Sequence, residues 1–209
     1  MTTDASGRRK LLIATGSAHK FAELRAMLDL PNTDLVSLAD VGLADDAEET
    51  GVTFSENAQI KADHYARLSG LATLADDSGI EVDHLDGRPG VYTRRYAGSD
   101  ATDGQNNEKL LSEMAGVEPA ERTGRYRCVL VMVDRMHGLR LQADGTFEGR
   151  VALAPRGTAG FGYDPIFEPA SEPIGGRTVG QLSGEEKNAI SHRALAARTM
   201  RALLIANGY

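Results

Sequence analysis

The stretch that decides the fold is residues 71–79, which read LATLADDSG. The first five residues form an apolar run, with Gly70 before it and Gly79 closing the stretch, and this pattern predicts a buried strand of about five residues. Asp76 and Asp77 follow directly. Two carboxylates at the end of a buried strand lose hydration and repel each other, so they need a cation or a proton. A charged turn is one interpretation, because Ser and Gly favour turns; a site that holds Mg²⁺ and activates water is the other.

The rest of the chain predicts helices that alternate with strands early and a meander of strands later. Helix starts are indicated by capping-box spacings at residues 53–56 and 183–186. We expect strands at 11–14, 35–37, 71–75 and 126–133, a hairpin of 139–142 with 146–150 around Asp144-Gly145, and helices at 18–30, 53–68, 102–115 and near the C-terminus. This order predicts an α/β fold with a mixed central β-sheet flanked by helices.

Composition predicts an ordinary globular protein. The 209 residues carry 30 acidic and 23 basic side chains, a net charge of −7, which argues against binding nucleic acid polymers or an anionic membrane. The single cysteine, Cys128, lies in an apolar run and reads as a buried structural thiol. Residues 1–9 read as a polar tail without the apolar core of a signal peptide, and residues 10–209 as a single domain. We therefore expect a cytoplasmic protein.

Two features resemble parts of a phosphate and metal site. Residues 15–20 read TGSAHK, a turn from a strand into a helix. Free N–H groups at a helix N-terminus favour anions, and Lys20 adds a charge. The acidic loop that contains Glu48 and Glu49 is the second feature, because these carboxylates could join Asp76 and Asp77 around Mg²⁺. A common lysine-bearing turn and a solvated acidic loop are the alternatives. Candidate residues here are Thr15, Gly16, Ser17, Ala18, His19, Lys20, Glu48, Glu49, Lys61, Asp76, Asp77 and Ser78.

Two further features could take a flat ligand. Residues 157–165 read GTAGFGYDP, in which glycines around Phe161 allow close backbone approach and the ring offers a stacking face. Near the C-terminus, Ser191 can cap a helix whose first turn carries His192 and Arg193, where positive charges oppose the helix dipole. A loop with two core aromatic residues and a surface His-Arg pair are the alternatives. Candidate residues here are Phe161, Gly162, Tyr163, Asp164, Lys187, His192 and Arg193.

Together these motifs resemble the inosine triphosphate pyrophosphatase family, the dITP/XTP pyrophosphatases. The resemblance runs from Leu11 to about Ala206, with the segments in the family's order. The matching segments are 14–16 with Lys20 and Glu23; 48–51 with Phe54, 56–58 and Lys61; 75–79; 90–92 with 95–98; 160–165; and 186–193. One departure is Ser17, where the family usually has Asn; Ser also donates and accepts a hydrogen bond but is shorter.

The resemblance implies Mg-dependent hydrolysis of deaminated purine nucleoside triphosphates to a monophosphate and pyrophosphate, by a homodimer with two lobes around a nucleotide-binding cleft. Asp77 is our choice for the general base, and Glu48, Glu49, Asp76 and Asp77 for holding Mg²⁺. Residues 15–20, Lys61, Ser78, Lys187 and Arg193 would serve the phosphates. Residues 161–164 with His192 and Arg193 would bind the purine base. A nucleotide pyrophosphatase with another base preference and a non-catalytic nucleotide sensor are the alternative functions.

Overall fold

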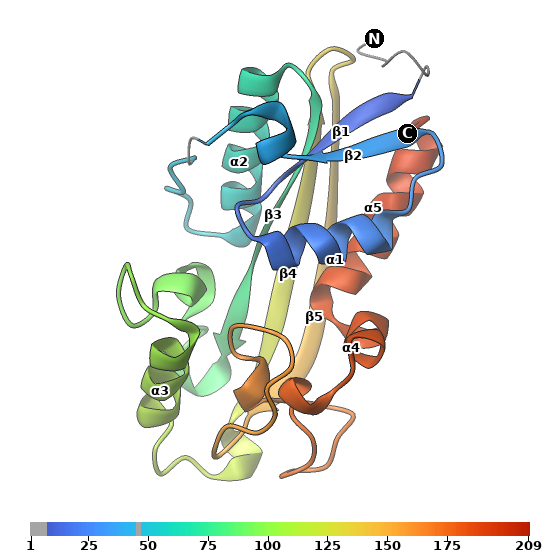
Figure 1. The fold of residues 1–209 in the computed structure, drawn as a ribbon. Coiled ribbons are helices and arrows are strands. Elements are labelled where there is room, and N and C mark those ends of the chain that lie inside the picture. Colours follow the sequence, from blue (N-terminus) through green and yellow to red (C-terminus); the bar gives the residue numbers. More distant parts are fainter. Residues whose placement is uncertain (1–7, 45–46) are drawn as a thin grey trace. The chain divides into compact units, whose positions relative to one another are not determined.

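The structure is a computed structural model that describes residues 8–44 and 47–209. These residues form one mixed sheet with the strand order β2-β1-β3-β4-β5-β6 (Figure 1). β1 runs parallel to β2 and β3, whereas β5 and β6 are antiparallel. The strands are β1 Arg9–Ala14, β2 Thr33–Ser37, β3 Ala72–Val82, β4 Thr123–Asp134, β5 Leu139–Val151 and β6 Phe167–Pro169. The α-helices are α1 Ala18–Leu28, α2 Phe54–Ser69, α3 Asp103–Glu113, α4 Gly184–Ile190 and α5 His192–Ala206. The predicted α/β class with a mixed sheet is confirmed.

The chain divides into two compact units. Unit 1 comprises Met1–Asp77, Cys128–Gly145 and Arg193–Tyr209, and unit 2 comprises Ser78–Arg127 and Thr146–His192. Strands β3, β4 and β5 contribute residues to both units. Each unit has its own cluster of buried apolar side chains.

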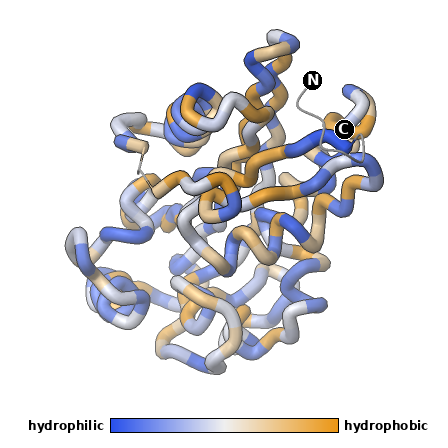
Figure 2. Tube along the Cα trace, turned by 45° about the horizontal axis from the view of Figure 1, so that its top comes forward, coloured by the Kyte–Doolittle hydropathy of each residue, from blue (hydrophilic) through white to orange (hydrophobic). Residues whose placement is uncertain are grey.

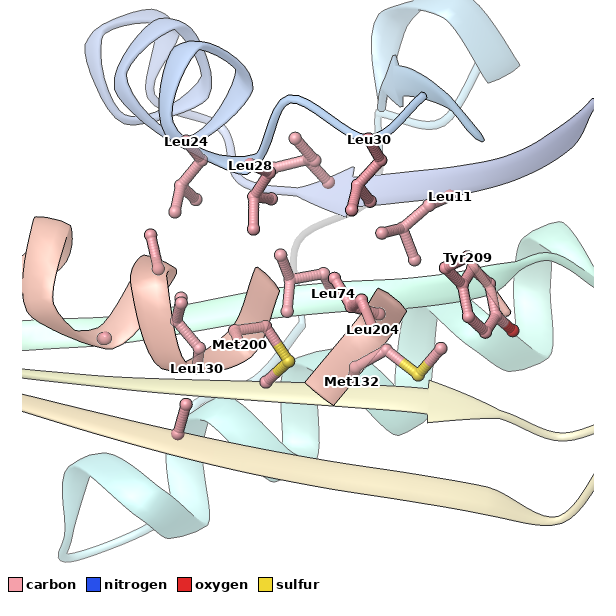
Figure 3. Close-up of a cluster of buried hydrophobic side chains, with 14 of the residues drawn as sticks. Leu11, Leu24, Leu28, Leu30, Leu74, Leu130, Met132, Met200, Leu204 and Tyr209 are labelled. Atoms are coloured by element: carbon pink, nitrogen blue, oxygen red, sulfur yellow. The ribbon is translucent and has the colours of Figure 1, made fainter. Parts of the chain in front are cut away.

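In unit 1, helices cover both faces of the strands. Leu24 and Leu28 of α1 point toward Leu74 of β3 (Figure 3). The same cluster contains Leu11, Ile13, Leu130, Met132, Met200 and Leu204, from β1, β4 and α5. Leu12 of β1 is also fully buried but lies outside this cluster, as the alternation of side chains along a strand requires. Helix α2 contacts β1 and has buried side chains of its own. It therefore covers the other face of the strands, the face to which Leu12 belongs.

In unit 2, aromatic side chains build the core. Tyr126 of β4 meets the Phe167 ring edge-on with ring centroids 4.7 Å apart, and Phe147 of β5 lies 5.5 Å from Phe167. Leu110 and Met114, from α3 and its end, are fully buried in the same cluster. This core supports the irregular segment between β5 and β6 that carries the glycine-rich residues 157–162.

The predicted helix starts are confirmed by hydrogen bonds. Thr53 Oγ1 accepts from the Glu56 N–H at 3.1 Å, and Ser183 Oγ accepts from the Glu186 N–H at 3.1 Å, so both capping boxes form. The C-terminal helical region is split at Ser191, whose extended backbone separates α4 from α5.

The predicted hairpin around Asp144-Gly145 is wrong. Both residues lie inside β5, where buried positions alternate with exposed or half-buried ones from Gln142 to Gly149. The turn falls earlier, between β4 and β5, where Asp134 Oδ1 accepts from the Met136 and His137 N–H groups and Gly138 takes a φ of 62°. The alternating burial of the strand therefore outweighs the local turn propensity of Asp-Gly.

The predicted tail over residues 1–9 falls mostly outside the described residues, but Arg9 belongs to β1 and is an exception to that prediction. Asp45 and Asp46 of the acidic loop also lie outside them. Hydrophilic and hydrophobic residues are interspersed along the chain trace (Figure 2). Within residues 8–44 and 47–209, no helix is long and apolar enough to cross a membrane.

Candidate functional site

Asp76 and Asp77 lie in the middle of β3 and not at its end. The strand continues through Ser78 and Gly79 to Val82, so the predicted strand end at Ala75 and the alternative of a charged turn are wrong. Consecutive side chains of a strand point to opposite faces. Asp76 therefore shares the face of Leu74, which α1 and α5 cover, and Asp77 faces α2. The two carboxylates do not form an adjacent pair.

Asp76 is held by cations from two helices. Lys20 Nζ of α1 lies 2.9 Å from Asp76 Oδ2, and the Arg193 guanidinium of α5 lies 3.6 Å from the same oxygen. Burial raises the pKa of the Asp76 carboxyl, but the charges of Lys20 and Arg193 outweigh it and hold that pKa well below its usual range. Arg193 also donates to Glu23 Oε2 at 2.6 Å. Asp76 thus stays ionised within a buried network.

The turn before α1 places Lys20. Ser17 is the N-cap residue, and its Oγ accepts from the Lys20 N–H at 3.4 Å. Thr15 Oγ1 accepts in turn from the Ser17 N–H at 3.2 Å. Gly16, Ala18 and His19 are exposed. Ser17 therefore performs the capping that starts the helix, and its hydroxyl accepts one of the first N–H groups of α1.

Asp77 has a different environment on the α2 face. Lys61 Nζ of α2 lies 3.0 Å from Asp77 Oδ1 and 3.3 Å from Glu49 Oε1. Asp77 Oδ2 is buried and has no hydrogen-bond partner in the part of the chain that the structure describes. Burial raises the pKa of the Asp77 carboxyl, and the charge of Lys61 only partly offsets this. Asp77 is therefore the more basic carboxylate and has one oxygen available.

The four predicted metal ligands are not gathered into one cluster. Glu49 shares Lys61 with Asp77, whereas Glu48 is exposed and Asp76 is turned to the other face. Among residues 8–44 and 47–209, no group of three or more His, Cys, Asp or Glu side chains could hold a metal ion. The donors nearest a common point are Asp77 and Glu49, which fits an ion that takes one or two carboxylates and fills its other positions with phosphate oxygens and water.

The candidate residues of unit 2 gather around Asp164. Its Oδ2 accepts from Lys187 Nζ at 2.7 Å and from the Phe161 N–H at 2.9 Å. The same ammonium lies 4.4 Å from the centroid of the Phe161 ring. At Gly160, whose φ is 79°, an added Cβ would come within 2.0 Å of Asp164 Oδ2, so only glycine fits. Lys187 is thus held against the loop by Asp164 and Phe161. The sequence predicted it as a phosphate ligand.

His192 and Arg193 belong to different clusters although they are neighbours in sequence. The His192 ring stacks on Tyr126, with centroids 4.7 Å apart and planes 7° from parallel. Tyr126 Oη donates to Asp164 Oδ1 at 3.4 Å. Arg193 contacts Glu23 and Asp76 in unit 1 instead. The sequence assigned no role to Glu23 or Tyr126. Glu23 was named only among the residues that match the family, and it lies three residues after Lys20, on the same helix face.

The sequence profile of the Ham1 family matches residues 11–203 of this chain. The chain belongs to the Ham1 family. A Shigella flexneri relative named dITP/XTP pyrophosphatase is 46% identical over 193 residues, which are 92% of this chain and 96% of that protein. A Bacillus licheniformis relative of the same name is 44% identical over 197 residues, 94% of this chain and 98% of that protein. The resemblance drawn from the motifs is confirmed.

Solved Ham1 structures share the fold. A HAM1 protein from Coxiella burnetii aligns with a TM-score of 0.85 at 38% identity and covers 95% of this chain and 99% of its own. A nucleoside-triphosphatase / dITP/XTP pyrophosphatase from Mycobacterium abscessus aligns with a TM-score of 0.74 at 38% identity, covering 93% of this chain and 98% of its own.

The chemistry available to this Ham1 protein follows from its two clusters. Unit 1 offers a basic carboxylate, Asp77, beside Lys61, a combination suited to activating water next to an anion. A second lysine, Lys20 at the start of α1, pairs with Asp76. Unit 2 offers an aromatic ring of intermediate exposure with a lysine against it, a combination suited to a flat polar ligand.

Proposed function

We propose that this chain hydrolyses dITP, ITP and XTP or dXTP to the nucleoside monophosphate and pyrophosphate. The names of its relatives support this substrate class. The observation that carries the proposal is Asp77, a buried carboxylate with a raised pKa, one oxygen 3.0 Å from Lys61 and the other without a partner in the described part of the chain. Such a group can take a proton from water at the start of a hydrolysis.

In the proposed reaction, water attacks the α-phosphorus. A bond forms between the water oxygen and that phosphorus, the bond to the oxygen that bridges the α- and β-phosphorus breaks, and pyrophosphate leaves with the bonding electrons. Asp77 accepts the proton of the water. Lys20 and Lys61 bind and neutralise the phosphate oxygens, with the α1 N-terminus and Ser78 as further donors.

Mg²⁺ is part of the proposal. Glu49 and Asp77 are hard oxygen donors that would hold it together with phosphate oxygens, whereas the carboxylates of Glu48 and Asp76 lie elsewhere. When bound, the ion supplies charge that stabilises the developing negative charge on the leaving group.

We assign binding of the purine base to unit 2. Phe161 offers a stacking face, and Lys187 and His192 lie in the same cluster around Asp164 and Tyr126. Hypoxanthine and xanthine carry a 6-oxo acceptor where adenine carries an amino donor. Donors aimed at that oxygen would therefore discriminate against adenine, whose amino group leaves them unpaired.

A substrate panel with Mg²⁺ tests the proposal, with pyrophosphate and orthophosphate measured separately for dITP, ITP, XTP, dATP, dGTP and modified pyrimidine nucleotides. We expect pyrophosphate and monophosphate from the three deaminated purines at the highest kcat/KM. Preference for a pyrimidine would support the alternative of another base preference, and binding without turnover would support a nucleotide sensor. Orthophosphate with a diphosphate product would contradict the mechanism.

A homodimer in the cytoplasm is also proposed, on the resemblance alone. Light scattering coupled to size exclusion tests the dimer: a mass of about twice the 22.3 kDa chain is expected, and a monomer would contradict it.

A further inference from the structure

Two side chains of helix α3 form hydrogen bonds with the backbone of Gly162, a residue of the glycine-rich loop. The Gly162 N–H donates to Asp103 Oδ2 at 2.7 Å, and Asn107 Nδ2 donates to the Gly162 carbonyl oxygen at 3.1 Å. Asp103 and Asn107 are four residues apart, so they lie on the same face of the helix. Both backbone polar groups of Gly162 are therefore satisfied by one rigid element.

Asn107 is poorly explained by stability alone. It is 7% exposed, and its Oδ1 is buried without a hydrogen-bond partner within residues 8–44 and 47–209. A buried acceptor without a partner costs free energy, and an apolar side chain of similar size would avoid that cost. The neighbouring Asn106 uses both ends of its amide, on the Ala97 N–H and the Arg94 carbonyl. What distinguishes Asn107 is its single bond to Gly162.

The remaining anchors of the loop hold the residues on both sides of Gly162. Tyr163 is almost fully buried, and its Oη donates to the Thr93 carbonyl oxygen at 2.8 Å. Asp164 is held by Lys187. Phe161 directly precedes Gly162 and keeps an intermediate exposure, and its N–H donates to Asp164 Oδ2 at 2.9 Å. The contacts of α3 with Gly162 therefore act on the backbone next to this ring, in addition to the bond from Asp164.

We propose that Asp103 and Asn107 of α3 are positioning residues for purine recognition, which act by orienting Gly162 and thereby the Phe161 ring. The inference rests on the proposed function, because it assumes that this loop contacts the base. Neither residue touches the phosphates in this account, so their loss changes the choice of base and leaves the hydrolytic step intact.

The test compares Asn107→Leu with Asn106→Leu, two buried asparagines at adjacent positions of one helix. In Asn107→Leu, the ratio of kcat/KM for dITP to that for dATP falls by about tenfold or more through a higher KM for dITP, while kcat stays within about twofold. Asn106→Leu lowers the melting temperature without changing the ratio. An unchanged ratio in a folded Asn107→Leu, or an equal fall in both variants, overturns the inference.

A second pair keeps the test decisive if Asn107→Leu does not fold. Asp103 is exposed, so Asp103→Ala is expected to fold and to lower the same ratio, and Asp103→Asn, whose amide oxygen still accepts the Gly162 N–H, restores it. Failure of Asp103→Asn to restore a lowered ratio, or no effect of Asp103→Ala, overturns the inference. A wild-type protein that releases no pyrophosphate from dITP instead contradicts the proposed function itself.

Discussion

Asp76 and Asp77 are neighbours in β3, yet each pairs with a lysine of a different helix: Asp76 with Lys20 of α1 and Asp77 with Lys61 of α2. The alternation of the strand separates them. In the folded protein the pKa of Asp76 is therefore lowered, and the pKa of Asp77 is raised. Divergent pKa values in two carboxylates often mark a division of roles, here a charged anchor for Lys20 and a base.

Replacing Asp77 should remove turnover and spare the fold. Asp77→Asn keeps the shape but loses the basic oxygen, so kcat for dITP should fall by about 10²-fold or more. Steady-state kinetics checks the rate, and thermal unfolding checks the fold. Near wild-type kcat in a folded Asp77→Asn protein would transfer the role of base to Glu49.

Replacing Asp76 should mainly destabilise the protein. Asp76→Asn leaves Lys20 and the buried Arg193 without their shared counter-charge, which should cost about 3–5 kcal/mol of unfolding free energy. Urea unfolding measures this. The control is Glu48→Gln, an exposed acidic residue, which should change stability by less than about 0.5 kcal/mol. Equal stabilities for the two variants would contradict the anchoring role of Asp76.

Replacing Arg193 should affect both stability and substrate. Its side chain is 2% exposed and contacts Glu23 and Asp76, so Arg193→Ala leaves the buried Asp76 carboxylate and the half-buried Glu23 carboxylate without it and should cost about 3–5 kcal/mol. If Arg193 also contacts the purine, as the resemblance implies, the variant raises KM for ITP more than for ATP. Equal losses in kcat/KM for ITP and ATP would show that Arg193 makes no base contact.

The free energy of unfolding at acid pH should depend on Asp134. Burial raises the pKa of this carboxyl, but hydrogen bonds from Tyr209 and His137 outweigh it and lower the pKa overall. A carboxyl whose pKa falls on folding stabilises the native state above its unfolded-state pKa, near 3.9, and that stabilisation is lost as the pH falls through the folded-state value. Wild type should therefore lose more unfolding free energy than Asp134→Asn between pH 5 and pH 3. Parallel pH curves would contradict this.

Local sequence signals predicted the helices well and the strands less well. Thr53 with Glu56 and Ser183 with Glu186 identify helix starts because each capping box is completed within four residues. The ends of β3 and β5 depend on neighbouring strands, which local propensity does not contain. The predicted strand end after Ala75 and the predicted turn at Asp144-Gly145 both fall inside strands.

The site was predicted in its residue types but not in its pairings. The motifs identify Lys20, Lys61 and the two aspartates, but the division of the aspartates between two faces follows only once β3 is known to continue past them. Lys187 was assigned to the phosphates on the family resemblance, as one of several cations that would complement the triphosphate charge. Its ion pair with Asp164 joins residues 23 positions apart, a distance at which a single sequence carries no pairing signal.

The most direct test of the central claim, attack of water at the α-phosphorus, is hydrolysis of dITP in water enriched in ¹⁸O, with the products analysed by mass spectrometry. The mechanism predicts one ¹⁸O atom in dIMP and none in pyrophosphate. Label in pyrophosphate with unlabelled dIMP would place the attack at the β-phosphorus, and labelled orthophosphate at the γ-phosphorus; either result would contradict the account.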